Sequence, residues 1–197
     1  MIKKFKFIYI FLLLIFITKT AYSLEPNIFV QSTVNRASQI LSDDIPKSEK
    51  IEKLKIIATD TVDIKGIGFY TLGKFRKGLN DAEKKEYTKL FREYFLKSFS
   101  SRLAEYTNPK IDVQSQEKLN DKYTIVSSIL VATDTRPEIK IQWRVYTKDP
   151  DKPLIRDLII EGLSLARTQK EEFSSIIQSN DGDIQSLFSS LKEFINN

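Results

Sequence analysis

Apolar residues recur at three- and four-residue spacing in the first part of the chain beyond residue 23. This pattern predicts a helix from Pro26 to Asp44 and a second helix with Ser48 as its cap. A short helical segment is predicted over residues 63–75. Gly66 and Gly68 weaken that segment as a helix, which indicates close packing or a bend.

The clearest helical pattern runs from Asp81 to Tyr106. Asn80 and Glu83 have the spacing of a capping box at its start. The apolar stripe of this helix is rich in aromatic residues: Tyr87, Leu90, Phe91, Tyr94, Phe95, Phe99, Leu103 and Tyr106. So many rings on one face are compatible with ordinary core packing and with the wall of a cavity.

The pattern changes to that of strands after Pro109. Four strands are predicted, over residues 110–116, 122–134, 138–147 and 153–165. Their short connections favour antiparallel neighbours. The third strand alternates apolar and polar residues, which predicts one buried face. The fourth carries apolar residues on both faces, which predicts a central position.

Two amphipathic helices end the chain, one from Ala166 to Ser179 and one after the Asn180-Asp181-Gly182 turn. Helices, then an antiparallel sheet, then helices form an α+β fold. We expect residues 24–197 to make a single domain.

Residues 1–23 have the layout of a secretory signal peptide that is cleaved after Ser23. Lys3, Lys4 and Lys6 precede an apolar run that is too short to span a membrane comfortably, and Ala21-Tyr22-Ser23 provides a cleavage site. An uncleaved N-terminal anchor is the alternative. A signal peptide predicts export, to the bacterial periplasm or the cell exterior.

Composition narrows the possible chemistry. The chain has no histidine and no cysteine, which excludes the usual base for a serine nucleophile, thiol catalysis, disulfides and zinc sites built on these residues. Of 31 basic residues four lie before residue 24 and no acid does, so 27 basic residues face 26 acidic ones in the remainder. That balance gives no electrostatic support for nucleic-acid binding.

The segment DLIIEGLSLARTQKEEF, residues 157–173, has the outline of a hydrolase nucleophile elbow around Ser164. Without histidine Ser164 has no ordinary route to activation. We therefore interpret Ser164 as the cap of the following helix, and Gly162 as the site of a bend or bulge in the strand.

Three stretches together resemble the MlaC family, also called the toluene-tolerance auxiliary family. They are YTLGKFRKGLNDAEKKEYTKLFREYF, IQWRVY and RDLIIEGLSLARTQKEEFSSII. The most specific part is the run from Asp157 to Ser164, in which an acid and three apolar residues precede Glu-Gly, an apolar residue and serine. The tryptophan that many members carry shortly before this aspartate is missing here.

The resemblance implies a soluble periplasmic phospholipid carrier, monomeric and without metal or cofactor, that helps to maintain outer-membrane lipid asymmetry. Its implied partners are an outer-membrane lipoprotein complex and an inner-membrane ABC transporter with an MCE-domain subunit. The implied lipid pocket lies between sheet and helices. Its candidate wall residues are Ile67, Tyr70, Phe91, Phe95, Ile129, Val131, Ile139, Ile141, Trp143, Leu158, Ile160, Leu163 and Phe173.

Arg144 or Lys140 is a candidate for a headgroup contact. Two other functions stay open: a small hydrolase or isomerase that uses Asp157 or Glu161 as a desolvated carboxylate, and an envelope adhesin or scaffold.

Overall fold

A computed structural model describes residues 24–197 of the chain. The predicted signal peptide, residues 1–23, lies outside the described residues. The elements follow in the order α1 (Pro26–Ser42), α2 (Lys47–Thr61), α3 (Ile64–Thr71), the 3₁₀ helix η2 (Gly73–Lys77), α4 (Asp81–Leu103), β1 (Ile111–Asn120), β2 (Tyr123–Leu130), β3 (Ile139–Tyr146), β4 (Leu154–Ile160), β5 (Leu163–Ser164), α5 (Leu165–Gln178) and α6 (Ile184–Asn196).

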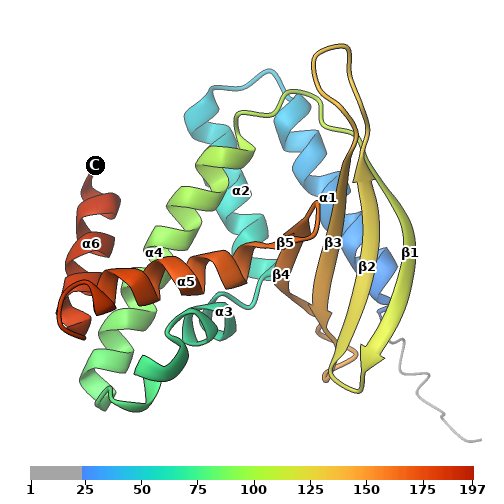
Figure 1. Ribbon diagram of the computed structural model, residues 1–197. Helices are drawn as coiled ribbons and strands as arrows, with labels where there is room; N and C mark the ends of the chain where they lie inside the picture. The colour runs from blue at the N-terminus through green and yellow to red at the C-terminus, as the bar shows by residue number, and fades with distance from the viewer. Residues whose placement is uncertain (1–23) are drawn as a thin grey trace, which may run out of the picture.

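The helices and the sheet form separate layers (Figure 1). The sheet is antiparallel with the strand order β1-β2-β3-β4-β5. Helix α1 packs against β1 and β2, while α5 runs from the end of β5 away from the sheet and passes across α4. This confirms the α+β fold, and it also shows a fifth strand.

The fifth strand arises because the predicted strand over residues 153–165 turns back on itself. Glu161 and Gly162 both have positive φ, 49° and 84°, and Ile160 pairs with Leu163 across them. Two successive residues with positive φ form a tight hairpin turn, for which glycine is well suited. Of the two predicted alternatives, a bend or a bulge at Gly162, the structure has a change of direction, since this glycine belongs to a hairpin turn.

Strand β4 is not central, contrary to the prediction. Its outer edge is covered only by the two residues of β5 and by a parallel bridge from Val62 to Ile155. The Asp63 N–H extends that bridge by donating to the Ile155 carbonyl at 2.9 Å. Helices α3 and α5 also contact β4, so its backbone edge is covered although no long strand pairs with it.

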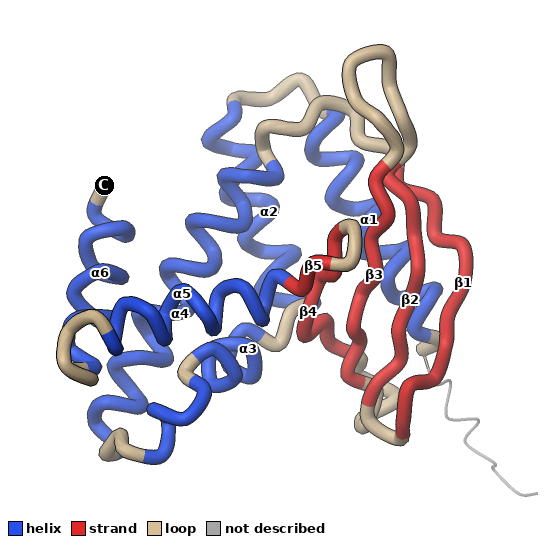
Figure 2. The backbone as a smooth tube through the Cα atoms, in the orientation of Figure 1, coloured by secondary structure: helices blue, strands red, loops and turns tan. Residues whose placement is uncertain are grey.

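The two faces of β3 differ as its alternation predicts. Ile141, Trp143 and Val145 are buried on the face toward the helices, and Lys140 and Gln142 are exposed on the other (Figure 2 shows the layers). The sheet thus has one packed face and one solvent face, as antiparallel sheets commonly do.

Helix α4 begins as predicted. The Asn80 side chain accepts from the Glu83 N–H, and the Glu83 carboxylate accepts from the Asn80 N–H, both at 2.9 Å. The helix ends at Leu103, three residues before the predicted end. Tyr106 lies outside the helix, and the Arg136 guanidinium lies over its ring, 5.4 Å from the ring centroid.

Helix α2 begins at Lys47, so Ser48 lies inside its first turn and is not its cap. The two glycines of α3 confirm the predicted close packing. A Cβ on Gly66 would lie 2.4 Å from the Asp63 carboxylate, and a Cβ on Gly68 would lie 2.7 Å from the Phe91 ring. Both positions exclude a side chain unless a neighbour moves.

Tyr87 lies at the centre of the helical layer. Its ring stacks on Phe188 of α6 at 6.1 Å, and its hydroxyl donates to the Gly68 carbonyl at 3.1 Å. Burial raises the pKa of the Tyr87 hydroxyl well above its usual range. Tyr87 therefore joins α3, α4 and α6 into one unit.

Within residues 24–197, no helix combines the length and the apolar character needed to cross a bilayer.

Candidate functional site

A cavity of about 210 Å³ lies where α4, α5 and the sheet meet. Its walls come from four regions: the junction of α2 and α3, one face of α4, the strands β3 and β4, and the first turns of α5. The lining residues are Val62, Ile67, Phe91, Tyr94, Phe95, Ser98, Phe99, Arg102, Trp143, Ile155, Asp157, Leu158, Leu165, Ala166, Thr168, Gln169 and Glu172.

The α4 wall consists of three phenylalanines at four-residue spacing. This spacing places them one above another on a helix. Phe95 stacks on Phe91 with a centroid distance of 6.1 Å and on Phe99 with 5.3 Å. Phe91 is buried, whereas Phe95 and Phe99 are only partly buried, so the wall opens toward the end of α4.

The sheet wall is formed by Trp143 and Leu158, which are direct partners across β3 and β4. The Trp143 indole N–H donates to the Ser128 hydroxyl at 2.9 Å, and that hydroxyl donates to the Ile141 carbonyl at 3.2 Å. The polar atom of the indole is thereby satisfied within the sheet. The Trp143 ring can then serve as apolar wall without an unpaired donor.

Asp157 anchors the start of α5 beside the cavity. Only 1% of its side chain is exposed. Its carboxylate accepts from the Ser164 hydroxyl at 2.7 Å and from the Ala166 N–H at 3.0 Å. The Ser164 hydroxyl in turn accepts from the Arg167 N–H at 3.1 Å, which confirms Ser164 as the helix cap. The segment that resembles a nucleophile elbow is therefore the N-terminal end of α5, and the Ser164 hydroxyl is used there in hydrogen bonds.

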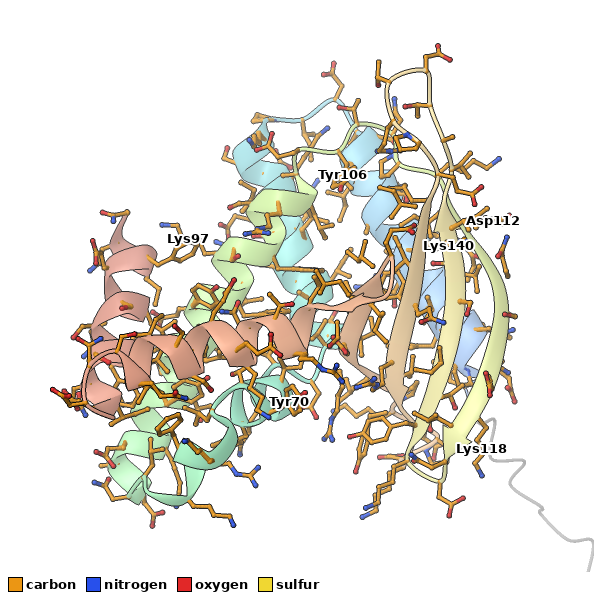
Figure 3. The ribbon with its side chains drawn as sticks, in the orientation of Figure 1. Tyr70, Lys97, Tyr106, Asp112, Lys118 and Lys140 are labelled. Atoms are coloured by element: carbon orange, nitrogen blue, oxygen red, sulfur yellow. The ribbon has the colours of Figure 1, made fainter. Side chains whose placement is uncertain are left out.

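Arg144 compensates the buried charge of Asp157. One guanidinium nitrogen lies 3.6 Å from the Asp157 carboxylate. The Arg144 Nε atom is buried without a hydrogen-bond partner among the described residues. Arg144 does not line the cavity, and neither does Lys140, which Figure 3 shows on the sheet face that points to solvent. The structure thus offers no support for either residue as a headgroup contact in this cavity.

Hydrogen bonds and an ion pair between Asp63 and Arg156 join α3 to the sheet beside the cavity. The Asp63 carboxylate accepts from Gly66 N–H at the start of α3 and from Arg156 Nε at 2.7 Å. Arg156 also donates to the Tyr123 hydroxyl at 2.8 Å and lies 3.8 Å from the Tyr146 ring centroid. Three strands and one helix are therefore tied together at this end of the sheet.

The cavity has polar residues where α4 and α5 face each other. These are Ser98 and Arg102 from α4, and Thr168, Gln169 and Glu172 from α5. The Tyr94 hydroxyl donates to the Gln169 side-chain oxygen at 2.8 Å. Burial raises the pKa of Tyr94, the negative charge of Glu172 raises it further, and Arg102 acts in the opposite sense. A mostly apolar interior therefore meets solvent at a polar, charged mouth.

Five of the thirteen candidate wall residues line this cavity: Ile67, Phe91, Phe95, Trp143 and Leu158. Phe173 packs behind the wall, with its ring 6.2 Å from Phe91. Ile139, Ile141 and Ile160 lie on the helix-facing side of the sheet, nearer the loop between β2 and β3, and do not reach the cavity.

The remaining four candidates lie elsewhere. Ile129 points to the opposite face of the sheet, and Val131 lies past the end of β2. Leu163 is 59% exposed at the β4–β5 hairpin. Tyr70 lies on the outside below α5 (Figure 3), where it borders a separate polar surface groove along α5.

Sequence reasoning missed the mouth residues, and it missed the lining residues Leu165 and Ala166 in the first turn of α5. The helical period of α4 could have identified Ser98 and Arg102 as further wall residues. Ser98 lies four positions after Tyr94, and Arg102 lies eleven positions after Phe91, so both share the face of these aromatic residues. Ile155 had no such signal, and Asp157 was expected only as a candidate carboxylate and as part of the family signature. A β-bulge opposite Arg144 and Val145 interrupts the register of β4, and bulges are hard to locate from sequence.

Residues 31–193 match the family model described as "MlaC protein". The chain belongs to the MlaC family. The fold also resembles a solved structure of a phospholipid-binding protein from Ralstonia solanacearum in complex with a phospholipid, with a TM-score of 0.73 and 18% sequence identity. The match covers 88% of this chain and 98% of that one. At this identity the likeness concerns the fold.

The described residues contain no group of three or more acidic side chains able to hold a metal ion. Glu161, one candidate for a desolvated catalytic carboxylate, is exposed in the hairpin turn and accepts from the Lys140 N–H. Asp157, the other candidate, is buried, but its carboxylate already accepts hydrogen bonds from Ser164 and Ala166 and pairs with Arg144.

Proposed function

We propose that this MlaC-family protein is a soluble periplasmic carrier that binds a phospholipid by its acyl chains. The observation that carries the proposal is the mostly apolar cavity between helices and sheet, whose polar lining residues lie at its mouth except for Asp157, which Ser164, Ala166 and Arg144 engage. Such an arrangement suits an amphipathic ligand, because the apolar part can be buried while the headgroup stays in water. The phospholipid is cargo, and the proposal needs no cofactor.

The energetics explain why a carrier needs an apolar wall. Two acyl chains contain on the order of 30 methylenes, and exposing them to water costs about 0.8 kcal/mol each, or roughly 24 kcal/mol in total. Aromatic rings such as Phe95, Phe99 and Trp143 supply large apolar area per residue. Burial against them would offset much of that cost.

Loading must enlarge the cavity. A methylene is similar in size to a water molecule, which occupies about 30 Å³ in the liquid. A cavity of about 210 Å³ therefore holds on the order of seven such groups, a fraction of one acyl chain. The α4–α5 layer and the sheet would have to separate. The exposed Leu165 and the partly buried Phe95 and Phe99 have less packing to lose than the buried wall residues.

The wider role follows as part of the proposal. The protein would take phospholipid from one membrane complex and deliver it to another, between an outer-membrane lipoprotein complex and an inner-membrane ABC transporter with an MCE-domain subunit. Such transfer requires only that donor and acceptor differ in affinity for the lipid. Family membership supports this role. A hydrolase or isomerase is disfavoured, because Glu161 is exposed and Asp157 is engaged in capping α5.

The test is lipid content after detergent-free purification from a bacterial host, measured by organic extraction and mass spectrometry. We expect about one phospholipid per protein. Phe95→Glu, which introduces a carboxylate into the cavity wall, should lower the lipid content at least fivefold. Ile56→Glu is the matched control on an exposed helix position that is 61% accessible, and should leave it unchanged. Wild-type protein without phospholipid would overturn the proposal.

A further inference from the structure

The mouth of the cavity carries two opposite charges that are not paired with each other. Arg102 lines it from the last turn of α4, and Glu172 lines it from α5. Within residues 24–197 no ion pair includes either side chain. Among the described side chains, the one hydrogen bond to either group is from the Gln169 amide to the Glu172 carboxylate at 2.9 Å. Both charges are thus available to a ligand.

The other charged group of the lining is already neutralised. Asp157 is held by Arg144, Ser164 and Ala166 and has no free oxygen to offer. Arg102 and Glu172 line the cavity together with Tyr94, and their charges shift the pKa of the Tyr94 hydroxyl in opposite directions. One positive and one negative group therefore lie at the same opening, the first on α4 and the second on α5.

We propose that Arg102 and Glu172 form a headgroup site selective for zwitterionic phospholipids, those with an ammonium group beyond the phosphate. This inference rests on the proposed function and adds a substrate class to it. A guanidinium matches the geometry of a phosphate through paired N–H donors. A carboxylate attracts the ammonium, and it gives no such attraction to a headgroup that ends in neutral glycerol.

The size of the effect follows from the exposure of the mouth. Both residues are exposed, so each charge contact is worth the modest amount of a surface ion pair, which corresponds to about a two- to fivefold preference. Such contacts weaken at high ionic strength. The acyl chains would still provide most of the affinity, and the two charges would choose among headgroups.

The experiment offers delipidated protein to vesicles that contain equal amounts of phosphatidylethanolamine, phosphatidylglycerol and diacylglycerol with identical acyl chains. The protein is then repurified, and the bound lipids are quantified by mass spectrometry. Wild-type protein should retain about two to five times more phosphatidylethanolamine than phosphatidylglycerol. Glu172→Gln should bring this ratio close to one, while Arg102→Gln should reduce both phospholipids relative to diacylglycerol.

Matched controls come from the neighbouring α5 surface. Glu171 and Arg167 border the separate groove beside Tyr70 and do not line the cavity, so Glu171→Gln and Arg167→Gln should behave as wild type. If lipid binds but the headgroup ratios are the same in wild type and in both mouth variants, the headgroup site is refuted and the carrier function stands. If wild-type protein takes up no lipid of any kind, both are refuted.

Discussion

Replacing Asp157 by alanine should destabilise the protein strongly, because this carboxylate organises the start of α5. The substitution removes acceptors for the Ser164 hydroxyl and for the buried Ala166 N–H, and it leaves Arg144 without its partner. An unsatisfied buried N–H costs about 1–3 kcal/mol, and a lost cap contact about 1 kcal/mol. Arg144 adds little, since 36% of its side chain is exposed. The total is about 2–4 kcal/mol.

Urea and thermal unfolding followed by circular dichroism measure this loss. For a chain of this size a destabilisation of about 2–4 kcal/mol lowers Tm by roughly 5–15 °C. Ser164→Ala should cost about 1–2 kcal/mol, and the double variant should cost less than the sum, because the two residues share one hydrogen bond. Asp112→Ala, an exposed aspartate of β1, is the control and should stay within about 0.5 kcal/mol of wild type. Equal stability of Asp157→Ala and the control would refute this explanation of the Asp157 to Ser164 segment.

Two further predictions concern the helical layer. Gly66→Ala should destabilise the protein although alanine is the better helix former, because its Cβ would lie 2.4 Å from the Asp63 carboxylate. In an Asp63→Ala background the same substitution should be neutral or stabilising. Additive changes in the free energy of unfolding in this double-mutant cycle would contradict the clash. Raising the pH above about 10 should reduce stability, because the unfolded chain releases the Tyr87 proton at the ordinary tyrosine pKa while the native state retains it. The expected contribution of this residue to the slope is up to about 1.4 kcal/mol per pH unit. The slope should be smaller by this amount in Tyr87→Phe, which keeps the contribution of Tyr94, whose pKa burial also raises.

The sequence predicted those elements whose signals are local. The capping box of α4, the alternation along β3 and the cap at Ser164 each depend on residues a few positions apart, and the structure has all three. The family resemblance, based on the segment from Asp157 to Ser164, is confirmed by the match over residues 31–193. The predicted signal peptide, cleavage site and cellular location remain predictions.

The cavity could be predicted only in part, because its walls meet through tertiary contacts. Phe91, Phe95 and Trp143 follow from aromatic content and periodicity. Ile141 and Ile129 were also predicted as wall residues, because both lie in apolar strands. Ile141 is buried away from the cavity, and Ile129 faces the other side of the sheet. Periodicity identifies a face, and it does not show where along that face two layers diverge.

The position of β4 shows the same limit. Its apolar residues on both faces indicated a central strand. The structure instead shields this edge with the Val62 bridge and with the short strand β5, which forms only because Glu161 and Gly162 adopt positive φ. Neither contact has a signal within the strand itself.

Trp143 allows the most direct measurement of the central claim that acyl chains enter the cavity between helices and sheet. It is the single tryptophan of the chain, and it lines the cavity wall. Phospholipids brominated along the acyl chain should quench its fluorescence on binding, while the same lipids without bromine should not. Phe95→Glu should abolish this quenching. Stoichiometric binding of the brominated lipid without any quenching of Trp143 would place the acyl chains elsewhere and would contradict the account.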